Sequence, residues 1–183
     1  LTALDHLMKR HELVVHDVER LPIHGGSLRV FVSKSRKPTE RVTSLLKEEK
    51  KSGLCELAYY KGFADRVNAL KKDLVEKIDD LRSQGARIAA YGAAAKGATL
   101  VNFFGINKRH IDFVVDRSTY KQGRYMPGAR IPIHPPSALL EKSPDFCLLL
   151  AWNFADEILE QQQAFRDRGG KFIIPIPSVR IAT

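Results

Sequence analysis

Four short, almost wholly apolar segments follow Gly85, and segments with a helical pattern separate them. Apolar runs that alternate with helices are typical of a parallel sheet that is covered on both faces. The pattern therefore predicts an α/β fold over residues 85–183, with a Rossmann-like parallel sheet and helices on both of its faces. The expected strands are 87–91, 111–115, 146–151 and 172–176, with a further short one in ARIPIH, and the expected helices are 94–104, 137–141 and 154–168.

The beginning of the chain has a different pattern. Residues 1–33 predict one helix followed by two strands, 13–19 and 28–32, which form a hairpin. So small a unit has no core of its own. We therefore expect it either to pack on the rest of the chain or to complete a sheet whose other strands precede Leu1.

The middle of the chain predicts a linker and two helices. Residues 33–40 are polar and charged and contain a proline, which is typical of a linker. From Thr39 to about Gln84, apolar residues recur at spacings of three and four, which predicts two helices, the second long, amphipathic and ended by Gly85. We therefore expect three parts: 1–33, 34–84 and 85–183.

Positive charge gathers in residues 96–130, within a chain whose net charge is +9. The acidic residues of this range are Asp112 and Asp116. Its basic residues are Lys96, Lys108, Arg109, Arg117, Lys121, Arg124 and Arg130. Such an excess suits a compact polyanion such as a diphosphate, but it equally suits a nucleic acid or a plain solvated surface.

Cysteine usage and hydropathy predict where the protein works. Cys55 and Cys147 lie far apart in apolar-looking segments, which is typical of free thiols in a reducing compartment. No apolar run approaches the ~20 residues of a membrane helix, and no signal peptide opens the chain. We therefore expect a cytoplasmic protein without a membrane segment.

The stretch ARIAAYGAAAKGATLVNFFGI changes from a strand to a helix at Tyr91-Gly92. Gly92 allows a sharp bend, Ala93 begins an uncluttered approach, Lys96 adds a charge within reach of a phosphate oxygen, and Gly97 allows close helix-to-sheet contact. The spacing G-x-x-x-K-G matches neither the dinucleotide fingerprint nor the P-loop. A phosphate site and tight packing of a small-residue helix on the sheet both remain open.

Four further polar residues fall near the same expected edge of the sheet. Asp116 ends a strand at a place where an acidic residue often binds ribose hydroxyls, but it also suits a cap on the turn DRST. Lys121 and Arg124 lie in a loop that either closes over an anion or forms a plain basic surface. Asn153 either faces the ligand or N-caps the next helix.

Several longer motifs together carry a family resemblance. Over essentially its whole length, the chain resembles the C-terminal portion of the S-adenosylmethionine-dependent C-methyltransferases that act on nucleotide-linked deoxysugars. The resemblance implies that residues 1–33 end a methyl-donor domain and that residues 85–183 help to hold the nucleotide sugar. The motifs that carry it are VERLPIHGGSLRV, YGAAAKGATLVNFFGI, IDFVVDRSTYKQGRYMPGARIPIHPP, PDFCLLLAWNFADEIL and FIIPIPSVRI.

Other elements of that family do not occur in this sequence: the Gly-rich S-adenosylmethionine loop, the zinc-binding cysteines and the Tyr-x-Glu-His catalytic segment. The resemblance implies that they precede Leu1. It follows that this chain is expected to hold no metal, no S-adenosylmethionine and no catalytic residue, and to be inactive by itself. The implied reaction removes a proton next to a sugar ketone, and the resulting enolate attacks the sulfonium methyl group. His24 is a further substrate-binding candidate, in an interdomain cleft, or a structural turn histidine.

Three classes of function follow from these observations. The first is the substrate-binding part of a C-methyltransferase, whose partner is a nucleotide-diphosphate sugar or a similar carbonyl compound. The second is a separate nucleotide or coenzyme A binding module. The third is a basic nucleic-acid-binding domain, against which the sequence offers no interleaving of basic and aromatic residues and no finger spacing.

Overall fold

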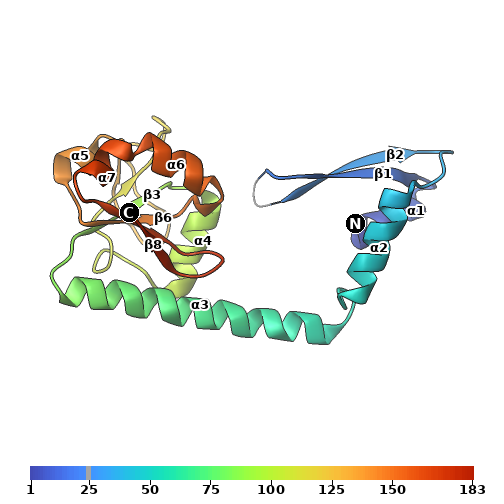
Figure 1. The fold of residues 1–183 in the computed structure, drawn as a ribbon, viewed down its shortest axis with the longest axis horizontal. Coiled ribbons are helices and arrows are strands. Elements are labelled where there is room, and N and C mark those ends of the chain that lie inside the picture. The colour runs from blue at the N-terminus through green and yellow to red at the C-terminus, as the bar shows by residue number, and fades with distance from the viewer. Residues whose placement is uncertain (24–25) are drawn as a thin grey trace. The chain divides into compact units, whose positions relative to one another are not determined.

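A computed structural model describes residues 1–23 and 26–183, so the candidate His24 lies outside the described residues. The chain divides into two compact units, Leu1–Arg66 and Val67–Thr183. Helix α3 (Leu57–Ser83; Figure 1) begins in the first unit and ends in the second. Within the described part of the chain, no helix is long and apolar enough to cross a membrane.

The first unit contains the expected helix and hairpin. Its elements are α1 (Thr2–Arg10), β1 (Val14–Leu21), β2 (Ser27–Ser33) and α2 (Glu40–Lys51). Strands β1 and β2 pair antiparallel, which confirms the predicted hairpin. Val15 and Val18 of β1 pack with Val42 and Leu45 of α2 in one small core. The hairpin therefore obtains its core from the helix that follows it.

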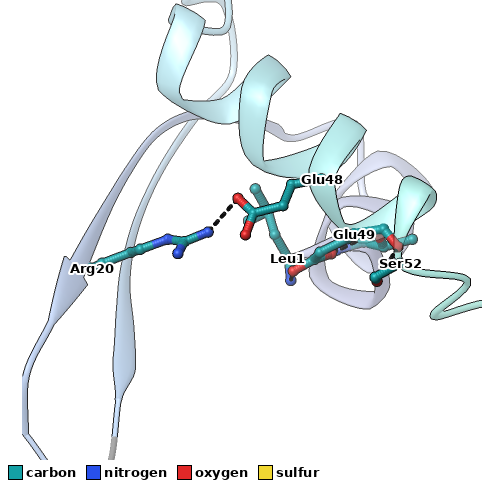
Figure 2. A network of polar contacts seen from close by, with 6 residues as sticks. Leu1, Arg20, Glu48, Glu49 and Ser52 are labelled. Carbon is teal, nitrogen blue, oxygen red and sulfur yellow. Dashed lines mark hydrogen bonds and ion pairs between the residues drawn. The ribbon is translucent and has the colours of Figure 1, made fainter. Parts of the chain in front are cut away.

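Polar contacts tie α2 to the elements around it. Arg20 of β1 and Glu48 of α2 form an ion pair of 2.6 Å (Figure 2). The neighbouring Glu49 accepts hydrogen bonds from the backbone N–H of Thr2, at 2.6 Å, and from its hydroxyl, at 2.7 Å. Because the first N–H groups of a helix have no acceptor within the helix, Glu49 caps the start of α1.

Helix α3 is buried only in its second half. Leu74, Ile78 and Leu81 belong to the core of the second unit, whereas Leu57 and Phe63 are exposed. The apolar spacing that predicted one long helix is thus confirmed, and the packing shows that its second half serves the sheet. Gly85, with φ +84°, follows the helix in the left-handed conformation that glycine adopts readily.

The second unit is built on a six-stranded sheet with the order β5-β4-β3-β6-β7-β8. All neighbouring strands are parallel except β7 and β8, which are antiparallel. This is the strand order of the Rossmann fold, in which the order reverses next to the first strand, here between β3 and β6. The strands are β3 (Ile88–Tyr91), β4 (Val114–Val115), β5 (Ile133–His134), β6 (Phe146–Leu149), β7 (Lys171–Ile174) and β8 (Arg180–Ala182).

Helices cover both faces of this sheet, as predicted (Figure 1). Successive strand residues point to opposite faces. Ala90 and Leu148 therefore pack with α3 and α4 (Ala95–Phe104), whereas Ala89 and Cys147 pack with the helices on the other face. Those helices are α5 (Ala138–Lys142), α6 (Ala155–Gln161) and α7 (Gln163–Asp167).

The strands predicted at 87–91 and 172–176 are each one residue longer than the observed β3 and β7, and two others are longer by more than that. The strand expected at 111–115 covers only Val114–Val115, because Ile111 still belongs to the preceding turn, where its N–H bonds Asn107 O at 3.1 Å. The strand expected at 146–151 ends at Leu149, since Leu150 and Ala151 turn into the 3-10 helix η1 (Trp152–Phe154).

Towards the end of the chain, one predicted helix is wrong in detail and one strand was missed. The helix expected at 154–168 is two helices, because the backbone leaves helical geometry at Gln162, with φ −102° and ψ 27°. The edge strand β8 was not predicted, since it is only three residues long and follows Pro175 and Pro177. The short strand expected in ARIPIH is confirmed as β5.

Candidate functional site

The strands β3, β4 and β6 all end at one edge of the sheet, where the strand order reverses. Open α/β sheets bind their ligands outside the carboxyl ends of the strands at this point. A cavity of about 310 Å³ lies there, and its position makes it the candidate site, although both units have larger cavities elsewhere. Its lining residues are Tyr91, Gly92, Ala94, Asp116, Arg117, Ala151, Phe154, Glu157, Ile158 and Gln161.

Gly92 in the β3–α4 turn and Gly97 in the first turn of α4 are both required by packing. Gly92 has φ +94°, and a Cβ on it would lie 2.9 Å from the Cβ of Ala151. A Cβ on Gly97 would lie 2.8 Å from the Cβ of Leu150. The interpretation of this stretch as a tight packing corner is therefore confirmed for both glycines.

The same turn leaves the beginning of α4 open to an acceptor. The first hydrogen bond of the helix runs from the N–H of Ala98 to the carbonyl of Ala94, at 2.9 Å. Ala94 is the N-cap and its side chain makes no capping bond, so the N–H groups of Ala95, Lys96 and Gly97 have no acceptor within the helix. Together with the positive end of the helix dipole, they favour an anion.

Lys96 stands in the first turn of α4 and reaches over to the β6 side of the site. Its Nζ donates a hydrogen bond to Oδ1 of Asn153 and lies 4.8 Å from the ring centre of Trp152. Burial lowers the pKa of Lys96. No carboxylate pairs with its ammonium among the residues that the structure describes. The predicted role of Asn153 as an N-cap is wrong, because it lies inside η1 and Phe154 is the N-cap of α6.

Asp116 joins the two loops that follow β3 and β4. Its Oδ1 accepts the N–H of Ser118 at 2.8 Å, which confirms the predicted cap on the turn DRST. Its Oδ2 accepts the N–H of Ala93 at 2.7 Å and the Nζ of Lys121 at 3.1 Å. Asp116 is 8% exposed, so these three donors come from the chain itself and satisfy a group that is nearly buried.

The other predicted site residues are only partly brought together. Tyr91 is 4% exposed and lines the cavity, and burial raises the pKa of its hydroxyl. Lys121 reaches the site through Asp116. Arg124 is exposed and does not line the cavity. Its backbone carbonyl accepts a hydrogen bond from the N–H of Ile133 at 2.8 Å.

Three polar residues at the rim of the cavity were not predicted as site residues. Arg117 donates to Oε1 of Gln161 at 3.3 Å and lies 3.8 Å from Oε1 of Glu157. Gln161 in turn donates to Oε1 of Glu157 at 2.7 Å. Two signals were available: Arg117 directly follows the strand-ending Asp116, and Glu157 and Gln161 stand one helical turn apart.

Comparison with known proteins identifies the family. Residues 22–177 match the family model described as the C-methyltransferase C-terminal domain. The chain belongs to this C-methyltransferase family. The chain is 38% identical over 184 residues to C-methyltransferase NovU of Streptomyces niveus, a match that covers 99% of this chain and 44% of that protein. It therefore spans less than half the length of this curated relative, and the family resemblance of its motifs is confirmed.

Among solved structures, the chain is similar to UDP-D-quinovosamine 4-dehydrogenase from Vibrio fischeri, with a TM-score of 0.40 and 16% sequence identity. The similarity covers 54% of this chain and 93% of that one.

Proposed function

We propose that this chain is the substrate-binding part of an S-adenosylmethionine-dependent C-methyltransferase that acts on a nucleotide-linked keto-deoxysugar or a similar carbonyl compound. In this proposal the second unit binds the diphosphate of the substrate at the beginning of α4. The observation that carries the proposal is the ammonium group of Lys96, which stands at a helix N-terminus without a carboxylate partner among the described residues.

Electrostatics supports this placement of the diphosphate. The N–H groups at the start of α4 and the charge of Lys96 act on the same side of the turn, and both favour phosphate oxygens. Only alanines stand between Gly92 and Lys96, and Asp116 fixes the turn through the N–H of Ala93. Lys121 and Arg124 remain proposed contributors to the positive field.

The same charge argues against S-adenosylmethionine as a ligand of this turn. The methyl donor is a sulfonium cation, which the nearby ammonium of Lys96 repels. The residues at this edge of the sheet therefore do not fit the cofactor. We propose that S-adenosylmethionine and the groups that catalyse methylation belong to other parts of the whole protein, and that this chain alone transfers no methyl group.

The three expected parts of the chain take these roles in the proposal. Residues 1–33 end the methyl-donor domain, residues 34–84 connect the domains, and residues 85–183 bind the substrate. We also propose a cytoplasmic location, because Cys55 and Cys147 are both free thiols, which persist in a reducing compartment.

Isothermal titration calorimetry of the chain with dTDP tests the proposal. We expect Lys96→Met to weaken dTDP binding by about tenfold or more, since it removes a charge-assisted hydrogen bond. Lys108→Met is the matched control, because neither lysine lines the cavity, but Lys108 is exposed in the loop that leads into β4 and lies outside the first turn of α4. Equal dTDP affinity in Lys96→Met and the unchanged chain would contradict the proposal. Tighter binding of ADP, S-adenosylmethionine or a short DNA duplex would favour the other functions.

A further inference from the structure

The cavity at the sheet edge has room beside the proposed diphosphate site for another part of the substrate. Ala94 belongs both to the turn before α4 and to the cavity lining, so the two sites adjoin. Ala151, Phe154 and Ile158 give the cavity apolar walls, and its volume is about 310 Å³. An apolar pocket of this size with a few polar groups at its rim suits a nucleoside better than a whole nucleotide sugar.

Asp116 stands where Rossmann folds often place the carboxylate that binds the ribose hydroxyls. Here the chain itself occupies that carboxylate, through the N–H groups of Ala93 and Ser118 and the ammonium of Lys121. Lys121 also neutralises its charge at 3.1 Å. Binding of a ribose hydroxyl would have to displace or share these donors, so Asp116 is a poor ribose ligand.

The rim formed by α6 is better placed to hold a nucleoside. Arg117 orients the amide of Gln161 through its Oε1, and Glu157 orients it through its Nε2. The side chains of Arg117 and Gln161 are both exposed. The ion pair between Arg117 and Glu157 is 3.8 Å long, so a ligand can open it at little cost. Each of the two hydrogen bonds to Gln161 uses only half of the capacity of its amide atom. Gln161 therefore still offers one N–H and one lone pair side by side, which suits the edge of a nucleobase.

We infer that this cavity receives the nucleoside end of the nucleoside diphosphate, that Arg117 and Gln161 hold it from the α6 side, and that Asp116 is a positioning residue without contact to the ribose. The inference rests on the proposed function, because the diphosphate at α4 brings the nucleoside to the cavity. Its consequence for specificity is that the 2′-hydroxyl group makes no difference to binding.

Calorimetric titrations with three probes test this inference: dTDP, its ribose counterpart 5-methyluridine diphosphate, and inorganic pyrophosphate. We expect the two nucleotides to bind with affinities within about threefold of each other. Arg117→Gln and Gln161→Ala are each expected to weaken dTDP about fivefold or more, and to change pyrophosphate affinity less than twofold. Arg109→Gln is the matched control, because Arg109 is exposed and does not line the cavity.

The outcomes separate this inference from the proposed function. If Lys96→Met weakens both dTDP and pyrophosphate but the rim variants leave dTDP unchanged, the nucleoside lies elsewhere and only the inference is wrong. Equal loss of dTDP and pyrophosphate in Arg117→Gln would make Arg117 a phosphate ligand and overturn the inference. A clear preference for the ribose form would do the same. If the unchanged chain binds none of the three probes, both proposals fail.

Discussion

At the scale of single residues, the ammonium of Lys96 is the charge on which the proposed phosphate site depends. Burial lowers the pKa of Lys96 from the ordinary lysine value of 10.5. An anion needs the protonated form, so we expect dTDP affinity to fall with rising pH, beginning at a lower pH than for an exposed lysine. Calorimetry between about pH 7 and 10 measures this. Lys96→Arg, whose guanidinium stays charged, should remove the dependence; the same pH profile in that variant would contradict the account.

Asp116 is predicted to stabilise the chain by joining the loop after β3 to the loop after β4. In Asp116→Asn, one oxygen becomes an NH₂ group that cannot accept the N–H of Ala93, and Lys121 loses its partner. We expect the free energy of unfolding to fall by about 1–3 kcal/mol, as for a buried donor that is left unsatisfied. Urea unfolding measures the change, with Glu160→Gln on exposed α6 as the control. Equal stability of Asp116→Asn and the control would show that the carboxylate does not fix these loops.

At the scale of elements, the contact between α4 and β6 depends on the absence of a side chain. Gly97→Ala places a methyl group against the Cβ of Leu150, at 2.8 Å. The overpacking cost of about 1–3 kcal/mol exceeds the gain in helix propensity of up to about 1 kcal/mol, so we expect a less stable chain.

Gly62→Ala is the matched control for that change, because Gly62 is also helical but an added Cβ would meet only the flexible end of one side chain. There the nearest atom to an added Cβ is the flexible Nη1 of Arg66, at 3.4 Å. We expect a gain of about 0.5–1 kcal/mol in urea unfolding. If both variants stabilise the chain, the close approach of α4 to β6 is not a constraint.

Acid stability of the first unit is predicted to depend on Asp17, which joins β1 to the start of α2. Hydrogen bonds from Arg41, and then from Thr39, lower the pKa of Asp17 from 3.8 to about 2. Its stabilising effect is therefore fully present above about pH 4 and is lost as the pH falls toward 2. Thermal unfolding of the chain and of Asp17→Asn should differ at pH 6 and converge near pH 2. A constant difference down to pH 2 would contradict the assignment.

The elements show how far the sequence predicts this fold. Strand and helix positions in the second unit follow from local apolar runs, and Gly92 and Asp116 were found because both stand directly at strand ends. Other features depend on tertiary packing. The break at Gln162 and the strand β8 have no strong local signal, and Arg117 meets Gln161 across 44 residues of sequence. Asn153, the hydrogen-bond partner of Lys96, likewise lies 57 residues away in the sequence. The sequence therefore shows that Lys96 is charged but not which residue it contacts.

At the scale of the whole molecule, the two units have different cores. Four residues form the buried core of the first unit, whereas two separate clusters cover the faces of the sheet in the second. Because the candidate site lies wholly in the second unit, we expect a fragment of residues 67–183 to fold and to bind dTDP within about twofold of the whole chain. Circular dichroism and calorimetry check the two statements. A folded fragment without dTDP affinity would mean that the first unit contributes to the site.

The central claim is that the diphosphate of a nucleotide sugar binds at the beginning of α4. A crystal structure of the chain with dTDP tests it most directly. The account predicts phosphate oxygens within hydrogen-bond distance of the N–H groups of Ala95 and Lys96 and of the Lys96 ammonium, with the base in the cavity beside α6. A dTDP molecule bound elsewhere on the chain, with Lys96 still on Asn153, would contradict it.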